Sequence, residues 1–150
     1  MYGENHILRP LRDYQLAAAD GTFRCWDRGI TSVVNILPTG GGKTMVAAEL
    51  HARHEGTPSL FLVPKDELMD QAVDKFKLLI CGKTVDTLAR LGSIGRDGKS
   101  MRLKQIMKAG VVIAMVQSLV NVLDDIPRNH FGMIGTDRKS TRLNSSHDQR

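Results

Sequence analysis

Eight consecutive residues, Leu37-Pro38-Thr39-Gly40-Gly41-Gly42-Lys43-Thr44, restrict the possible folds of this chain more sharply than its composition does. Consecutive glycines allow backbone N–H groups to converge on the oxygens of a triphosphate without side chains in the way. Lys43 would place an ammonium group against the β and γ phosphates, and Thr44 would offer a hydroxyl to Mg²⁺. The segment is therefore predicted to be a phosphate-binding loop for a nucleotide and Mg²⁺.

The residues on either side supply the context that such a loop requires. The β-rich run Ser32 to Leu37 is expected to form a strand that leads into the loop. Met45, Val46 and Leu50 lie on one side of a predicted helix that leads out of it, and this helix would aim its positive end at the anion. The generic fingerprint has a glycine six residues before Lys43, where this chain has leucine, so a glycine turn that merely precedes Lys-Thr stays an alternative.

Composition limits the remaining possibilities. The chain has 150 residues, 41% of them apolar, which is enough for the core of one domain. It has no apolar run of about 18 residues and no basic-then-apolar leader, so we expect no membrane span and no secretory signal, and a cytoplasmic location is the default. Cys25 and Cys81 are expected to be reduced and buried. His51 and His54 lack nearby ligand partners and are expected on a solvated helix surface rather than in a metal site.

Residues 137–150 are interpreted separately. The segment from Asp137 to His147 resembles the translation of a common short-read sequencing adapter, with agreement in all eleven codons, whereas the alternative is a natural disordered tail. We therefore expect a partial domain over residues 1–136, cut near Thr136, and a disordered artefact over 137–150. The segment carries +2 of the net charge of +5, which leaves an ordinary excess of +3 for residues 1–136.

A second motif, Leu11-Arg12-Asp13-Tyr14-Gln15, opens a predicted helix with an inward stripe of Leu11, Ala18, Thr22 and Trp26 and a terminator at Gly29. Followed by a strand and Leu-Pro-Thr-Gly-x-Gly-Lys-Thr, this motif resembles the N-terminal motor domain of superfamily 2 helicases. The closest group contains type III restriction-enzyme subunits and Rad25-like helicases, in which leucine or alanine commonly replaces the first loop glycine. The resemblance implies ATP as the nucleotide, with Gln15 reading the adenine edge and Arg12 helping to hold it.

Two predicted strand-to-helix junctions match family patterns for contact with the nucleic-acid backbone. After the predicted strand 59–63 comes Pro-x-x-x-Leu-x-x-Gln, and Lys65 adds a cation beside the first N–H groups of the next helix. After the predicted strand 111–115 comes the pattern Ala-Thr-x-Gln-Ser-Leu, with Met115 in place of threonine. Ser118 could instead cap the following helix. The resemblance implies contacts to DNA, with RNA possible, from Pro64, Lys65, Gln71, Gln117 and Ser118.

The predicted fold is α/β: a three-layer RecA-like P-loop domain with a mostly parallel sheet, incomplete at its C-terminus. The helix after Pro64 should bury Leu68, Ala72, Phe76 and Leu79. A strand over 85–91 and a helix over 99–109 are also expected, from weaker sequence signals. In relatives, the strand expected at 131–134 continues into Asp-Glu-x-His, which holds Mg²⁺ and polarises the attacking water. Here Gly135-Thr136 and the adapter-like segment follow, so this acidic box is expected to be missing.

The predicted function is that of an ATP-binding fragment of a nucleic-acid helicase or translocase, with little or no hydrolysis by the fragment itself. Two alternatives stay open. A small P-loop kinase should instead have an arginine-rich lid and a full Gly-x-x-x-x-Gly-Lys loop, and neither is present. A catalytically inert module that binds nucleic acid through its basic residues alone would do so independently of ATP.

Overall fold

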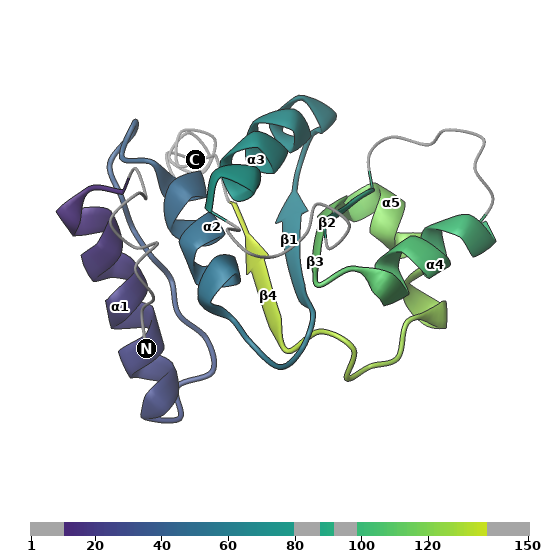
Figure 1. The fold of residues 1–150 in the computed structure, drawn as a ribbon, viewed down its shortest axis with the longest axis horizontal. Helices are drawn as coiled ribbons and strands as arrows, with labels where there is room; N and C mark the ends of the chain where they lie inside the picture. The colour runs from purple at the N-terminus through teal and green to yellow at the C-terminus, as the bar shows by residue number, and fades with distance from the viewer. Residues whose placement is uncertain (1–10, 80–87, 92–98, 138–150) are drawn as a thin grey trace, which may run out of the picture.

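The computed structural model describes residues 11–79, 88–91 and 99–137, which form a parallel sheet with helices on both faces (Figure 1). In chain order the elements are α1 (Asp13–Asp27), α2 (Lys43–Arg53), β1 (Ser59–Val63), α3 (Asp66–Leu79), β2 (Leu88–Leu91), α4 (Lys99–Lys108), β3 (Val111–Met115), α5 (Val116–Val120), the 3-10 helix η3 (Leu123–Asp125) and β4 (Met133–Thr136). The strand order is β2-β3-β1-β4, and each neighbouring pair is parallel.

The two central strands, β1 and β3, send alternate side chains into two separate cores. Phe61 and Ile113 belong to the core beneath α2 and α3, which also contains Met45, Ala48, Val63, Met69, Ala72, Val73, Phe76, Leu79 and Val111. Leu60 and Val112 belong to the opposite core, with Ile106, Ala109, Ala114, Leu119, Val122 and Ile126. Both faces of each central strand are covered, as in doubly wound sheets. The predicted three-layer α/β architecture is thereby confirmed.

Helix α1 lies outside α2 and is joined to it by charged groups. The Arg53 guanidinium donates to Glu49 through Nε at 2.6 Å and to Asp20 through Nη1 at 2.5 Å, and it lies over the Phe23 ring at 5.7 Å. Glu49 is fully buried, and its pairing offsets the cost of burying a carboxylate. These contacts fix α1 beside α2, so the start of α1 is held next to the loop that precedes α2.

The inward face of α1 differs from the predicted stripe. Gln15, Ala19 and Thr22 are buried, whereas Leu11, Ala18 and Trp26 are half-buried. The spacing of four and then three residues fits a helical face that is rotated from the predicted one. A polar residue occupies this face because its amide finds partners in the loop before α2. The predicted terminator is confirmed: Gly29 has a φ of 83° and follows the last turn of α1.

The strand predicted for Ser32 to Leu37 is absent, and residues 31–38 form neither helix nor strand. Val34 and Ile36 are 84% and 89% exposed, whereas a central strand of this fold would bury both faces. Each inner strand already has a neighbour on both sides, so only the outer edges of β2 and β4 could accept another strand among the described residues. Residues 31–38 pair with neither of these edges, and strand propensity alone does not produce a strand.

The structure also tests the predicted burial of individual side chains. Ala72, Phe76 and Leu79 are buried in α3 as predicted, but Leu68 is half-buried. The solvated position expected for His51 is wrong. Its ring is buried, Nδ1 lies 2.7 Å from the Ser59 Oγ, and the side chain packs against two phenylalanine rings.

Helix α4 matches the prediction for residues 99–109, and β2 confirms a strand at the end of 85–91, with residues 85–87 outside the described part. Cys25 is half-buried rather than buried, and Cys81 lies outside the described residues. Within the described ranges, every helix falls short of the length and apolarity needed to cross a membrane.

Candidate nucleotide-binding site

The glycine-rich segment begins with a tight turn over Pro38 to Gly41. The Gly41 N–H donates to the Pro38 carbonyl at 2.8 Å, and Gly40, the third residue of the turn, has a φ of 78°. This hydrogen bond together with a positive φ at the third position is the signature of a type II turn, which requires glycine there. A Cβ on Gly41 would lie 2.8 Å from the Pro38 oxygen, so this position also has no room for a side chain.

Gly42 converts the turn into the start of α2. It has a left-handed backbone, with φ 76° and ψ 44°, and its carbonyl accepts the N–H groups of Met45 and Val46. Lys43 and Thr44 are the first residues of α2, and the first N–H groups of a helix have no partner within it. The loop therefore directs a set of backbone donors and the positive end of the helix to one point.

The start of α1 donates two side-chain hydrogen bonds to one backbone carbonyl of this loop, that of Gly41. The Gln15 Nε2 donates to the Gly41 oxygen at 3.0 Å, and the Tyr14 hydroxyl donates to the same oxygen at 3.0 Å. The Gln15 Oε1 accepts the Arg12 N–H at 2.9 Å. These partners fix which end of the carboxamide is oxygen, because a carbonyl needs a donor and an N–H needs an acceptor.

The structure thus brings together the two motifs that the sequence separates by more than 20 residues. Gln15 is 5% exposed, yet its amide keeps one unused hydrogen and one unused lone pair, the pair that an adenine edge would need. Arg12 and Lys43 are exposed on the same part of the domain, with Thr44 half-buried. Pro38, Thr39 and Gly40 are exposed, whereas Gly41 is buried beneath them.

The candidates for nucleic-acid contact fall at the carboxyl edge of the sheet. Val63 pairs with Met115, so Pro64 and Gln117 follow the ends of two adjacent parallel strands. Pro64, Lys65, Gln71 and Gln117 are all exposed. Figure 1 shows the first turn of α2 and the carboxyl ends of β1 and β4 on the same side of the domain.

Ser118 differs from the other nucleic-acid candidates. It is 2% exposed, so its hydroxyl is not presented to solvent. It also lies in the middle of α5, so the alternative in which it caps the next helix is wrong. A nucleic-acid contact from Ser118 stays a prediction, and Ser118 is the least exposed of the five nucleic-acid candidates.

The sequence interpretation missed two groups. Tyr14 stands inside the quoted motif, but only its contact with Gly41 indicates a role. Asp137 was assigned to the adapter-like tail, yet in the chain as it stands it directly follows β4, and its N–H donates to the Leu62 carbonyl at 3.4 Å. It therefore places one carboxylate at the carboxyl edge of the sheet, and Arg138 follows it in the sequence.

Phosphate and Mg²⁺ place different demands on these residues. Where the structure describes the chain, no three His, Cys, Asp or Glu side chains cluster as a metal site. The Thr44 hydroxyl, half-buried at the start of α2, could hold Mg²⁺ beside a bound phosphate. The glycine cradle and the cation at Lys43 fit a phosphate chain.

Comparisons with known proteins identify the family and the fold. The family model described as "Type III restriction enzyme, res subunit" matches residues 9–145. Eight chains among solved structures match, including the crystal structure of the UvsW helicase from bacteriophage T4, with a TM-score of 0.58 and 22% identity over 91% of this chain. The match spans 46% of that helicase chain, so this chain corresponds to less than half of it. No curated protein matches.

Proposed function

Because the chain belongs to the type III restriction enzyme res subunit family, we propose that it is the ATP-binding part of a superfamily 2 helicase or translocase. In the whole protein, ATP hydrolysis would be coupled to movement on nucleic acid, with DNA as the expected substrate and RNA possible. The present chain would supply nucleotide binding and one side of the nucleic-acid path. A second motor domain would supply the arginine groups that complete the active site.

The observation that carries this proposal is the contact between the start of α1 and the phosphate loop. A loop that binds only phosphate does not need a carboxamide beside it. Here Gln15 is held against Gly41, with one donor and one acceptor position left over. An adenine edge offers one acceptor and one donor in complementary positions. This juxtaposition favours ATP over GTP, and it favours a helicase-type site over a general P-loop enzyme.

The role of each residue follows from its chemistry. The N–H groups at the start of α2 would bind phosphate oxygens, and Lys43 would neutralise charge on the β and γ phosphates. Thr44 would hold Mg²⁺, which when bound supplies charge neutralisation at the γ-phosphate. Arg12, exposed beside Gln15, would add a cation near the base and ribose. The residues proposed to contact ATP therefore all lie between positions 12 and 44.

Hydrolysis needs a carboxylate that orients water, and this is where the chain departs from its relatives. Asp137 could act as a ligand for Mg²⁺, but the adjacent glutamate of the family pattern is replaced by Arg138. An arginine cannot accept a hydrogen bond from the attacking water, so the group that would position this nucleophile is missing. We therefore expect ATP binding with little or no release of phosphate.

The direct test measures nucleotide binding and phosphate release by the 150-residue chain. Titration with a fluorescent ATP analogue should show Mg²⁺-dependent binding that ATP displaces more strongly than GTP. Lys43→Ala should abolish this binding, and Gln15→Ala should remove the preference for ATP. Binding that survives Lys43→Ala, or a rate of phosphate release similar to that of an intact helicase and dependent on Lys43, would contradict the proposal.

The nucleic-acid part of the proposal has its own test. Binding of single-stranded DNA should weaken with salt, because Lys65 and neighbouring groups would displace counterions from phosphates. If ATP and Lys43→Ala leave DNA binding unchanged, the chain is an inert nucleic-acid-binding module instead. If DNA does not bind at all but ATP does, a nucleotide-binding enzyme of another class is favoured.

A further inference from the structure

We propose that Tyr14 is a positioning residue for the phosphate loop, which fixes the Gly41–Gly42 peptide so that the Gly42 N–H faces the nucleotide phosphates. This inference rests on the proposed function, because it concerns the same loop. It assigns a role to a hydroxyl that neither the loop motif nor the adenine-reading amide requires.

The geometry of one peptide group carries the argument. The Tyr14 hydroxyl and the Gln15 Nε2 both donate to the Gly41 oxygen at 3.0 Å. A carbonyl oxygen has two lone pairs, so both hydrogen bonds can form together. In a trans peptide the C=O and the next N–H point in opposite directions, and no described residue has a cis bond. Holding the Gly41 oxygen toward α1 therefore turns the Gly42 N–H away from α1, into the loop.

The local backbone explains why an external anchor is useful. Gly40 and Gly42 both have positive φ, and glycine moves between backbone regions more easily than any other residue. Three consecutive glycines therefore leave the central peptide free to rotate unless its polar groups are held. Gly41 is also buried, and a carbonyl shielded from water needs hydrogen-bond donors. The two donors from α1 meet both needs.

The Tyr14 ring itself is not needed for the core. Its side chain belongs to an exposed residue, with 40% of its surface accessible, and neither hydrophobic core contains it. The hydroxyl reaches across 27 positions of sequence to the loop, whereas the ring lies at the surface of α1. Removing the oxygen alone should therefore change the loop and leave folding intact.

The experiment compares Tyr14→Phe with the unmodified chain, using inorganic tripolyphosphate and ATP as displacing ligands for a fluorescent ATP analogue. Tyr14→Phe should weaken both ligands by the same factor, about 3- to 10-fold, which corresponds to the loss of one hydrogen bond. Equal losses of affinity for tripolyphosphate and ATP would show that the Tyr14 hydroxyl supports binding of the phosphates rather than of adenine. The matched control is Thr22→Val, which removes a hydroxyl from the other half of α1 and should change binding less than about twofold.

A second readout separates positioning from a general effect on stability. The ¹⁵N resonance of Gly42 should shift in nucleotide-free Tyr14→Phe, because this nitrogen shares a peptide with the anchored carbonyl, and it should not shift in Thr22→Val. Unchanged affinity for both ligands, or a loss confined to ATP, would overturn the inference. If the unmodified chain binds ATP through Lys43 but Tyr14→Phe has no effect, only this inference fails. If the unmodified chain binds neither ligand, the proposed function fails and this inference with it.

Discussion

Gly42→Ala tests the contact between α1 and the phosphate loop through protein stability. Gly42 has a φ of 76°, and a Cβ built there would collide with the Gln15 Nε2. An L-residue in the left-handed region costs about 1–2 kcal/mol. Displacing Gln15 also breaks its hydrogen bond to Gly41, which contributes about 1 kcal/mol. The free energy of unfolding should therefore fall by about 2–3 kcal/mol.

The chain contains a matched control for the backbone part of this effect. Gly29 has a φ of 83°, but a Cβ built there has no heavy atom within 4 Å. Gly29→Ala should therefore cost only the conformational strain of about 1–2 kcal/mol. The difference between the two variants, about 1 kcal/mol, measures the collision with Gln15 and the lost hydrogen bond.

Urea or thermal unfolding provides the measurement, and a change of 1 kcal/mol corresponds to about 2–4 °C in Tm for a chain of this size. A double-mutant cycle with Gln15→Ala gives the sharpest result. In that background the collision is gone, so Gly42→Ala should cost no more than Gly29→Ala. If the effects of Gln15→Ala and Gly42→Ala simply add, the two residues are not in contact and the reasoning about the loop is wrong.

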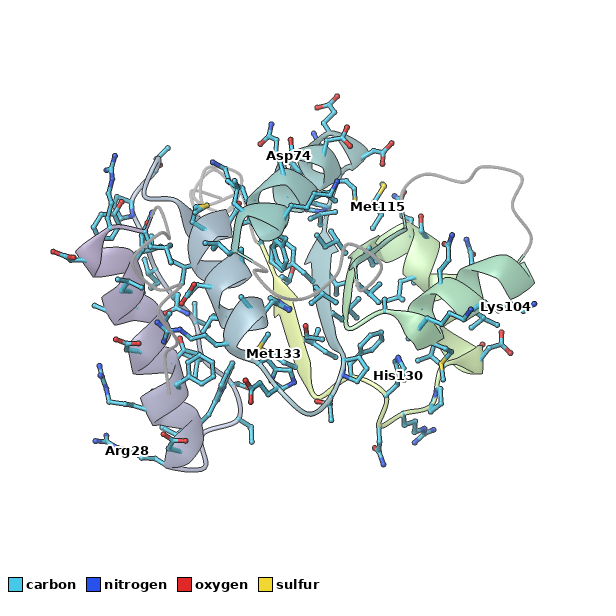
Figure 2. All side chains as sticks on the ribbon, in the orientation of Figure 1. Arg28, Asp74, Lys104, Met115, His130 and Met133 are labelled. Atoms are coloured by element: carbon cyan, nitrogen blue, oxygen red, sulfur yellow. The ribbon has the colours of Figure 1, made fainter. Side chains whose placement is uncertain are left out.

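Three further predictions concern other parts of the molecule. Lys65→Ala should reduce the slope of log affinity for DNA against log salt by about 1, whereas Lys104→Ala, on the exposed face of α4 and labelled in Figure 2, should leave the slope unchanged. Phe76→Ala, in the core beneath α3, should lower the free energy of unfolding in urea by about 3–5 kcal/mol, and Leu78→Ala, on the exposed side of the same helix, by less than about 1 kcal/mol. Ser59→Ala removes the hydroxyl beside the buried imidazole of α2 and should cost about 1–3 kcal/mol in the same assay, so a neutral result would contradict that contact.

The elements that could be predicted from sequence are those whose signal is local. The apolar runs that became β1 and β3, and the helices that follow them, carry their periodicity within 5 to 14 residues. Leu60, Phe61 and Val63 are all buried because both faces of β1 are covered, so a continuous apolar run was a sound signal. The three-layer fold followed from these runs and their alternation with helices.

The predictions that failed depend on partners elsewhere in the chain. The run 32–37 has strand propensity, but a strand forms only by pairing with a neighbour, and this run pairs with neither outer strand of the sheet. His51 looked like a surface residue because its spacing from His54 carries no information about Ser59 and Phe61, which lie on the next strand. The inward face of α1 was misplaced for the same reason, since Gln15 is buried by its bond to the loop rather than by its own hydrophobicity.

The phosphate loop depends on a smaller part of the molecule than the nucleic-acid edge does. The turn, the start of α2 and the anchor from α1 are built by hydrogen bonds among residues 12–46, and α2 is held by the core beneath it. The candidates for nucleic-acid contact instead depend on the pairing of β1 with β3. ATP binding should therefore persist in variants that alter Gln117 beyond β3, while coupling between ATP and nucleic acid requires the sheet that joins both sites. A variant of Gln117 that lost ATP binding without losing stability would show that the two sites are not separable in this way.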